Sequence, residues 1–347
     1  MDGTTLHFIA FVAFSVACFA AGYAARVRHW VHEDFSRRLH LTTLVGPWSL
    51  VMLLSLWLSP PGPQFAWLLV IEPVLVIGPA LATLWLSRRL GFSPKRAAVL
   101  AVSAGLGNIG FTLGGFVCYT LLKDPAMLPP WIDDTTLVEE EGRRRATAAA
   151  ALSYAIAQVT VMSVLAVVFL YPLAIRMGGD EHEAPPLSRL LRESFVDIRA
   201  TQLYAAVAGS LLGWFGPRFP GVIEDLRLLD VLMFVGAGGA YAGIGLRLHV
   251  GHTLREIKAH AVLGVARFVF VPLLTVAMIG ALRVAGFGQP ELVEKVLIIS
   301  AFCATAIQSV MIANLFHLDT KLASGLWVVN TGLCLALPIP LLVWWLA

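Results

Sequence analysis

Long apolar stretches set the strongest limit on how this chain can fold. A helix needs about 20 mostly apolar residues to cross a bilayer. Hydrophobic residues make up 58% of the chain and charged residues only 14%, against about 25% charged in a soluble domain. We therefore predict an all-α polytopic membrane protein with ten transmembrane helices, at residues 4–25, 41–58, 64–87, 95–122, 146–175, 198–216, 227–246, 258–284, 291–316 and 320–346.

Basic residues between these stretches predict the orientation in the membrane. One side holds sixteen Lys and Arg residues and the other holds eight. The richer side is expected to be cytoplasmic, which places both termini on the non-cytoplasmic side of a plasma (inner) membrane. Its loops are residues 26–40, 88–96, 176–199, 247–258 and 317–321. The first of them also looks amphipathic and is predicted to lie along the membrane surface.

The sequence gives no support for several classes of function. The four cysteines lie inside apolar stretches, where cysteine acts as a small packing residue. No CxxC or Cys/His metal spacing occurs, so no metal is expected. There is no HExxH or GxSxG motif and no pair of carboxylates on one intramembrane helix, so we do not expect an enzyme. The net charge of +3 gives no reason to expect a nucleic-acid partner.

The order of the stretches favours two related halves of five helices each. An odd number of helices per half means that the second half must insert upside down, as in many secondary transporters. Residues 177–197 lie where a linker between the halves would lie. The third and eighth stretches support the repeat, because each carries one ionisable residue, Glu72 or Arg267, with a proline a few residues further on.

The fourth stretch, AVSAGLGNIGFTLGGFV, places five glycines around Asn108. Each glycine weakens a helix by about 1 kcal/mol relative to alanine. Residues 105–115 are therefore candidates for a break, tolerated in a membrane only where the backbone is buried in protein or lines a wet cavity. Close helix packing through Gly110 and Gly114, which have GxxxG spacing, is the alternative. The ninth stretch has no glycine or proline at its centre, and its Gln308 is equally compatible with structural pairing between helices.

Four segments resemble the auxin efflux carrier family, which belongs to a wider group that includes the bile acid:sodium symporters. They are RRLHLTTLVGPWSLVMLLSLW, GNIGFTLGGFV, GAGGAYAGIGLRL and SVMIANLFHLDTKLASGLWVVNTGLCLALPIPLLV. The similarity is a pattern over nearly the whole chain, without a strict signature. Family members usually have a proline in each crossover helix, whereas Gly114 and Gly115 hold the first of these positions here. The second is held by Ala304, Thr305 and Ala306.

This resemblance implies a scaffold domain that dimerises, from residues 1–60 and 198–257. A transport domain would comprise residues 61–176 and 258–347, and the broken fourth and ninth helices would cross within it. The implied function is a permease that carries a small organic anion by alternating access, driven by a proton or sodium gradient or by the membrane potential. The missing prolines leave an alternative, a membrane sensor or receptor that kept this fold without net transport. The short central loop argues against auxin as the substrate.

Asn108 is the leading candidate for contact with the substrate. Its carboxamide both donates and accepts hydrogen bonds, and it matches the crossover asparagine that the resemblance places beside the substrate. The predicted substrate-binding set is Asn108, Gly107, Ile109, Thr305, Gln308, Ser309 and Asn330. For several of these residues, helix capping or pairing between helices is the alternative.

The two ionisable residues are predicted to serve in coupling, because charges inside a membrane are costly and mark functional sites. Glu72 is the predicted proton-coupling carboxylate. Arg267 is predicted to attract the anion or to pair with Glu72. The alternative for each is a side chain that snorkels to the membrane interface.

Overall fold

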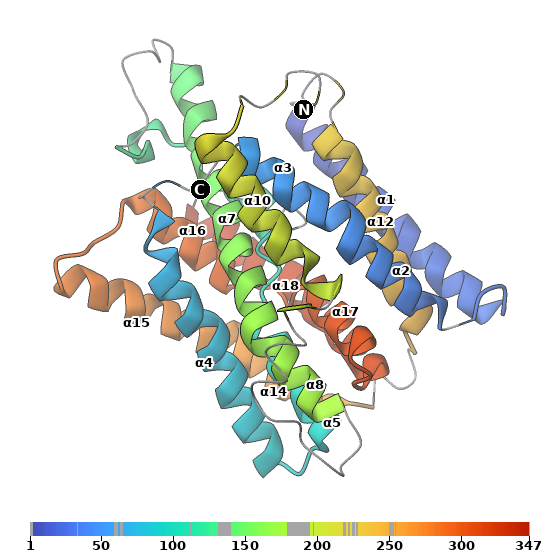
Figure 1. Ribbon diagram of the computed structural model, residues 1–347. Coiled ribbons are helices and arrows are strands. Elements are labelled where there is room, and N and C mark those ends of the chain that lie inside the picture. Colours follow the sequence, from blue (N-terminus) through green and yellow to red (C-terminus); the bar gives the residue numbers. More distant parts are fainter. Residues whose placement is uncertain are drawn as a thin grey trace.

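The computed structural model describes residues 3–32, 34–58, 62, 65–110, 113–130, 140–178, 195–196, 198–217, 220, 223, 226, 228–249, 253 and 255–346. Within these residues the fold is helical, and one isolated β-bridge is the sole strand-like pairing. Five helices are long and apolar enough to cross a membrane: Phe35–Leu58, Leu68–Arg89, Gly142–Gly178, Ile257–Val284 and Thr320–Trp345. The prediction of an all-α membrane protein is confirmed at this level (Figure 1).

Three of the long helices contain a π-helical turn. It separates α2 (Phe35–Thr43) from α3 (Ser49–Leu58), α7 (Glu140–Leu165) from α8 (Tyr171–Gly178), and α14 (Ile257–Val265) from α15 (Val271–Val284). Pro47 lies inside the first turn, and Pro172 and Pro272 follow the other two closely. Proline has no backbone N–H and disturbs the ladder of the preceding turn, and π-turns commonly absorb such a disturbance.

Two predicted boundaries are wrong. Residues 26–40 do not form a surface helix, because α2 begins at Phe35 and continues into the membrane-spanning helix. Ser36 and His40 of this segment are fully buried, whereas Val27, Trp30 and Phe35 remain exposed. The helix predicted from residue 146 begins at Glu140 instead. Glu140 forms an ion pair at 2.7 Å with Arg144, one turn further along the helix. The loop residues 131–139 and 179–194 lie outside the described residues.

The other helices are α1 (Gly3–Val27), α4 (Leu68–Arg89), α5 (Pro94–Gly105), α6 (Gly114–Leu121), α10 (Thr201–Phe215), α12 (Leu228–Arg247), α16 (Glu291–Ala301), α17 (Ile307–Leu315), α18 (Thr320–Ala336) and α19 (Pro338–Leu346), with 3-10 turns at Pro125–Met127 and Ile198–Ala200. Of these, α4 alone and α18 together with α19 form two of the five long apolar helices. The predicted fourth and ninth helices are thus each two half-helices, α5 with α6 and α16 with α17.

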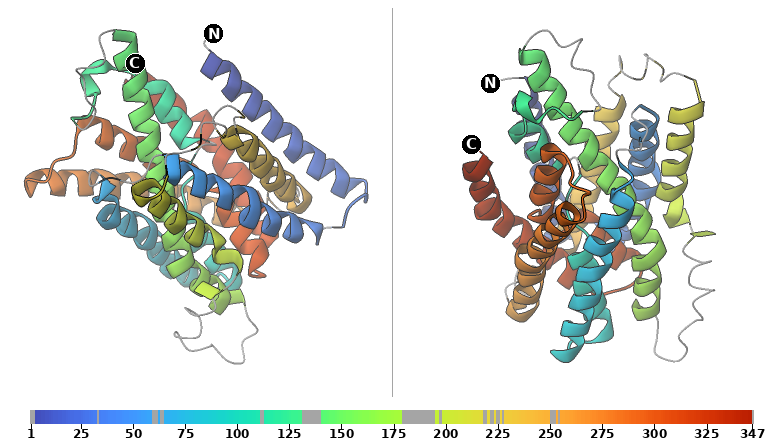
Figure 2. Two further views of the ribbon diagram at one scale, coloured as in Figure 1. Left: turned by 45° about the horizontal axis from the view of Figure 1, so that its top comes forward. Right: turned by 90° about the vertical axis from the view of Figure 1, so that its left-hand side faces the viewer.

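Two helix pairs form one side of the molecule, α1 with α12 and α10 with α3 (Figures 1 and 2). Glycine allows each pair to approach closely. A Cβ atom added at Gly22 of α1 would lie 2.2 Å from the carbonyl oxygen of Ala242, and one added at Gly209 of α10 would lie 2.4 Å from that of Leu53. Small residues at helix contacts of this kind are the usual packing solution in membranes, where no hydrophobic force drives helices together.

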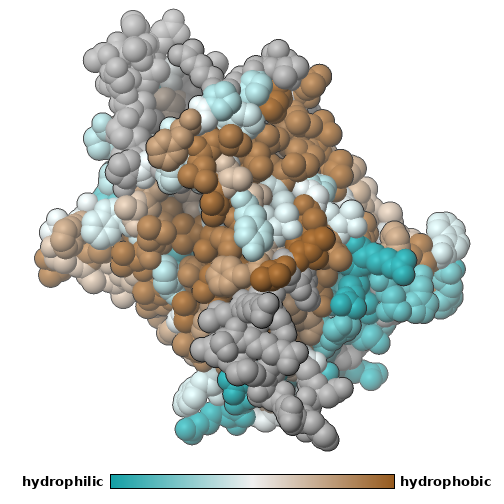
Figure 3. Space-filling view, viewed as in Figure 1, coloured by the Kyte–Doolittle hydropathy of each residue, from teal (hydrophilic) through white to brown (hydrophobic). Residues whose placement is uncertain are grey.

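Apolar side chains cover most of the face shown in Figure 3, and hydrophilic residues gather where α1 meets α2 and at the foot of the molecule. Large exposed hydrophobic residues include Leu69, Trp85, Leu273 and Leu341. A soluble monomer rarely exposes an apolar surface of this extent. Contact with lipid acyl chains accounts for it.

We predict that Gly22→Ala lowers the thermal stability of the purified protein in detergent, because the new methyl group collides with the α12 backbone. Overpacking of this kind costs about 1–3 kcal/mol. Gly264→Ala is the matched control, since no atom lies within 4 Å of a Cβ at that helical position. Equal unfolding midpoints for the two variants would contradict the close α1–α12 contact.

Candidate functional site

The two interrupted helices cross through their unwound segments. The backbone N–H of Asn108 donates to the carbonyl of Ala304 at 2.7 Å, and that of Ala306 donates to the carbonyl of Leu106 at 2.9 Å. These two bonds form an antiparallel bridge centred on Gly107 and Thr305. The helix break predicted around Asn108 is therefore present, and residues 302–306 are equally non-helical although they contain neither glycine nor proline.

Side chains of the ninth stretch hold this crossing together. The hydroxyl of Thr305 donates to the carbonyl of Ser103 at 2.7 Å, and its backbone N–H donates to Oδ1 of Asn330 at 2.8 Å. The hydroxyl of Ser309 donates to the carbonyl of Ala306 at 2.8 Å. Three predicted substrate ligands, Thr305, Ser309 and Asn330, thus satisfy backbone groups that the break releases, and none of them borders the cavity described below.

Arg267 lies at the same crossing, on the π-helical turn between α14 and α15, and is only 2% exposed. Its guanidinium donates to the carbonyl of Ala104 at 3.2 Å and to that of Cys303 at 2.7 Å. These carbonyls belong to the C-terminal ends of α5 and α16. Gly107 lies against the same group, since a Cβ there would be 2.6 Å from Nη2 of Arg267.

Glu72 lies in α4 and is 1% exposed. It accepts a hydrogen bond from Nε2 of Gln158 at 2.8 Å, and Oε1 of Gln158 accepts one from the hydroxyl of Ser300 at 2.8 Å. The side chains of Glu72 and Arg267 both point into the protein interior, where the two residues are 1% and 2% exposed. They interact electrostatically, but the guanidinium of Arg267 makes its hydrogen bonds to backbone carbonyls.

A cavity of about 100 Å³ borders the crossing. Of the predicted substrate ligands, Asn108, Gly107 and Gln308 line it, whereas Ile109 does not. Polar groups that the sequence interpretation missed are Ser55, Ser163 and Gln202, and the apolar wall is formed by Leu44, Trp48, Val51, Met52, Gly110, Ile156, Val159, Met162, Ala306, Ile307 and Met311. A lone glutamine in an otherwise apolar helix, as at position 202, is a signal that could have been followed.

The cavity lies between α3 and α10 on one side and α7, α17 and the crossing on the other. Nε2 of Gln308 donates to Oε1 of Gln202 at 3.3 Å and so connects the two sides. No charged side chain is among the described residues that line it. Since α17 begins at Ile307, its N-terminus opens on the cavity, and a helix N-terminus carries a partial positive charge.

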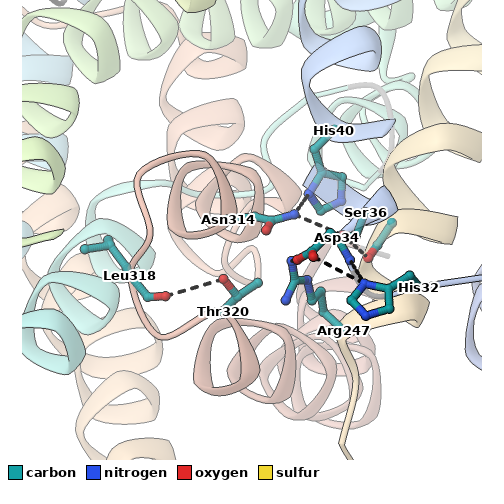
Figure 4. A network of polar contacts seen from close by, with 9 residues as sticks. His32, Asp34, Ser36, His40, Arg247, Asn314, Leu318 and Thr320 are labelled. Atoms are coloured by element: carbon teal, nitrogen blue, oxygen red, sulfur yellow. Dashed lines mark hydrogen bonds and ion pairs between the residues drawn. The ribbon is translucent and has the colours of Figure 1, made fainter. Parts of the chain in front are cut away.

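A second buried polar cluster, which the sequence interpretation also missed, joins three helices (Figure 4). The Ser36 hydroxyl donates to the carbonyl of Gly243 at 2.8 Å, and Nδ2 of Asn314 donates to that hydroxyl at 3.0 Å and to Nδ1 of His40 at 3.1 Å. The other ring nitrogen of His40 lies 3.3 Å from the carbonyl of Ala240. Because a carbonyl only accepts, the proton is assigned to Nε2 of a neutral imidazole. The cluster connects α17 to both α2 and α12.

Within the described part of the chain, no group of three or more His, Cys, Asp or Glu residues has the geometry of a metal site. Neither a protein family nor a curated protein matches this chain.

We predict that Asn330→Ala destabilises the protein, because it leaves the buried N–H of Thr305 without its acceptor. An unsatisfied buried group of this kind costs about 1–3 kcal/mol. Thr331→Val is the neighbouring control, since its buried hydroxyl has no hydrogen-bond partner among the described residues. Thermal unfolding should show a clear loss for the first variant alone, and an unaffected Asn330→Ala protein would contradict this role.

Proposed function

We propose that this chain is a secondary transporter that carries a small organic anion across the membrane by alternating access. One observation carries the proposal: unwound backbone in the middle of two interrupted helices borders a cavity between two groups of helices. Non-helical backbone at membrane depth is tolerated where it lines such a cavity. Transporters use it to bind solutes near the centre of the bilayer.

We further propose ten membrane crossings arranged as two inverted halves of five. The pairs α1–α12 and α3–α10 support this arrangement, because in the repeat they correspond to the first helix with the seventh and the second with the sixth. The crossing half-helices and the buried pair Glu72 and Arg267 are likewise in corresponding positions. Residues 1–60 and 198–257 would form the scaffold domain, and residues 61–176 and 258–347 the transport domain. The resemblance to auxin efflux carriers points to the same plan.

The lining of the cavity favours a solute with one anionic group and a small apolar body. Asn108, Gln202 and Gln308 supply amide groups, and the N-terminus of α17 attracts negative charge. Three methionines and several branched aliphatic residues form the rest of the wall. An apolar cavity of about 150 Å³ admits benzene, so about 100 Å³ suits a monocarboxylate of a few carbon atoms.

Glu72 is the residue that we propose for proton coupling. It is 1% exposed, and Gln158 and Ser300 connect its carboxylate to α16 by hydrogen bonds. Since Glu72 lies outside the cavity, coupling would act through the position of α16 and α7 and not through direct contact with the solute.

Uptake of labelled pyruvate and lactate into liposomes containing the purified protein tests this function. We expect Asn108→Ala to reduce uptake by about 5- to 150-fold, because loss of one buried amide contact costs about 1–3 kcal/mol and each 1.4 kcal/mol is tenfold. Thr147→Val is the control on α7. Its hydroxyl donates to the carbonyl of Arg143 at 2.9 Å, and the residue does not line the cavity.

Unchanged uptake in a folded Asn108→Ala protein would remove the crossing from the substrate path. Substrate-dependent thermal stabilisation that is lost in Asn108→Ala, without uptake by either protein, would instead support the sensor or receptor alternative. Parallel measurements with and without a pH gradient test the role of Glu72, because Glu72→Gln should remove the effect of the gradient.

A further inference from the structure

The crossing contains a permanent positive charge where carbonyl groups of two half-helices converge. The guanidinium of Arg267 contacts the carbonyl oxygens of Ala104 and Cys303, 3.2 and 2.7 Å away. Ala104 lies in the last turn of α5, and Cys303 lies two residues beyond the end of α16 at Ala301. Each helix C-terminus is equivalent to a charge of about −0.5. Both C-terminal ends direct carbonyl groups at Arg267, and its positive charge compensates their partial negative charges within the protein interior.

Such a position is where a secondary transporter would hold a coupling cation. Unwound backbone carbonyls and half-helix C-termini are the groups that coordinate sodium ions in discontinuous helices. The residues of this chain do not fit a sodium ion there, because the guanidinium takes up the same carbonyl oxygens. Arginine retains its charge in proteins, so a second cation at this place would meet electrostatic repulsion that water does not screen.

Two hydroxyl groups at the crossing are hydrogen-bonded to backbone carbonyls. The hydroxyl of Thr305 donates to the carbonyl of Ser103, and that of Ser309 to the carbonyl of Ala306. On the remaining side, Gly107 packs directly against Arg267, since a Cβ there would lie 2.6 Å from Nη2. Glu72, the buried carboxylate that interacts electrostatically with Arg267, is hydrogen-bonded to Gln158.

We propose that Arg267 is a built-in substitute for a coupling sodium ion, so that this protein works without sodium. The inference rests on the proposed transport function, since only a transporter has a coupling ion to replace. It also assigns Arg267 as a positioning residue: it holds the ends of α5 and α16 beside the cavity without contacting the solute, because it is not among the residues that line the cavity.

Thermal unfolding of the purified full chain in sodium, potassium and choline chloride at equal ionic strength tests this inference without any substrate. We expect the wild-type protein and Arg267→Lys to unfold at the same temperature in all three salts. Arg267→Ser frees the two carbonyls and adds a hydroxyl, so its midpoint should rise specifically in sodium. Arg283→Gln is the control for loss of a positive charge on α15, since that residue is exposed and pairs with Glu294.

Sodium-specific stabilisation of the wild-type protein would overturn the proposal, as would a folded Arg267→Ser protein whose stability ignores sodium. Should Arg267→Ser not fold, the wild-type protein and Arg267→Lys still decide the question. A complete lack of solute uptake by the wild-type protein in liposomes would count against the transporter function and leave these salt measurements as they stand.

Discussion

Backbone groups released where two helices are interrupted inside the protein are the constraint on which this structure depends. In an apolar interior each unpaired peptide group costs several kcal/mol. Groups at the crossing itself form hydrogen bonds with these peptide groups. Each unwound segment supplies partners for the other at Asn108 and Ala306, Thr305 and Asn330 satisfy further groups, and Arg267 supplies donors to the carbonyl ends of both half-helices.

The same arrangement explains why the candidate site lies beside the crossing and not within it. The interior of the crossing is closed by the cross-bridge and by the packing of Gly107 against Arg267. Its outer edge, with Asn108 and the start of α17, faces the cavity. Across this cavity Gln308 meets Gln202 through one neutral hydrogen bond at 3.3 Å. A bond of this kind contributes only about 0.5–1.5 kcal/mol, so it holds the two sides of the cavity together weakly.

The break that the sequence predicted in the fourth helix is present. Gly107 and Gly110 lie in the non-helical segment, whereas Gly105, Gly114 and Gly115 lie in the flanking half-helices. Gly105 also allows α5 to pack closely against α4, because a Cβ there would lie 2.7 Å from the carbonyl oxygen of Val76. The composition of the ninth helix does not predict the second break, because no residue in 302–306 disfavours a helix strongly. It depends on partners far along the chain, Ser103 and Asn330, which no local pattern reveals.

The roles of polar residues followed the same division. Of the predicted substrate ligands, Asn108, Gly107 and Gln308 line the cavity, whereas Thr305, Ser309 and Asn330 form hydrogen bonds to the backbone. Gln202 was missed because its partner across the cavity, Gln308, lies 106 positions away. Likewise His40 and Asn314 each lie in segments that look unremarkable alone and form one cluster only in three dimensions. The local sequence identifies candidate residues, and the contacts at the crossing show which of them bond to the backbone and which line the cavity.

Access of water-soluble reagents to position 307 tests the central claim most directly. In a chain whose four cysteines are replaced by serine or alanine, Ile307→Cys places a thiol at the N-terminus of α17 where it faces the cavity. We expect membrane-impermeant methanethiosulfonate reagents to label it from either side of the membrane, and pyruvate to slow the labelling. A thiol that reacts from neither side, or at a rate that pyruvate leaves unchanged, would contradict a solute site beside the crossed helices.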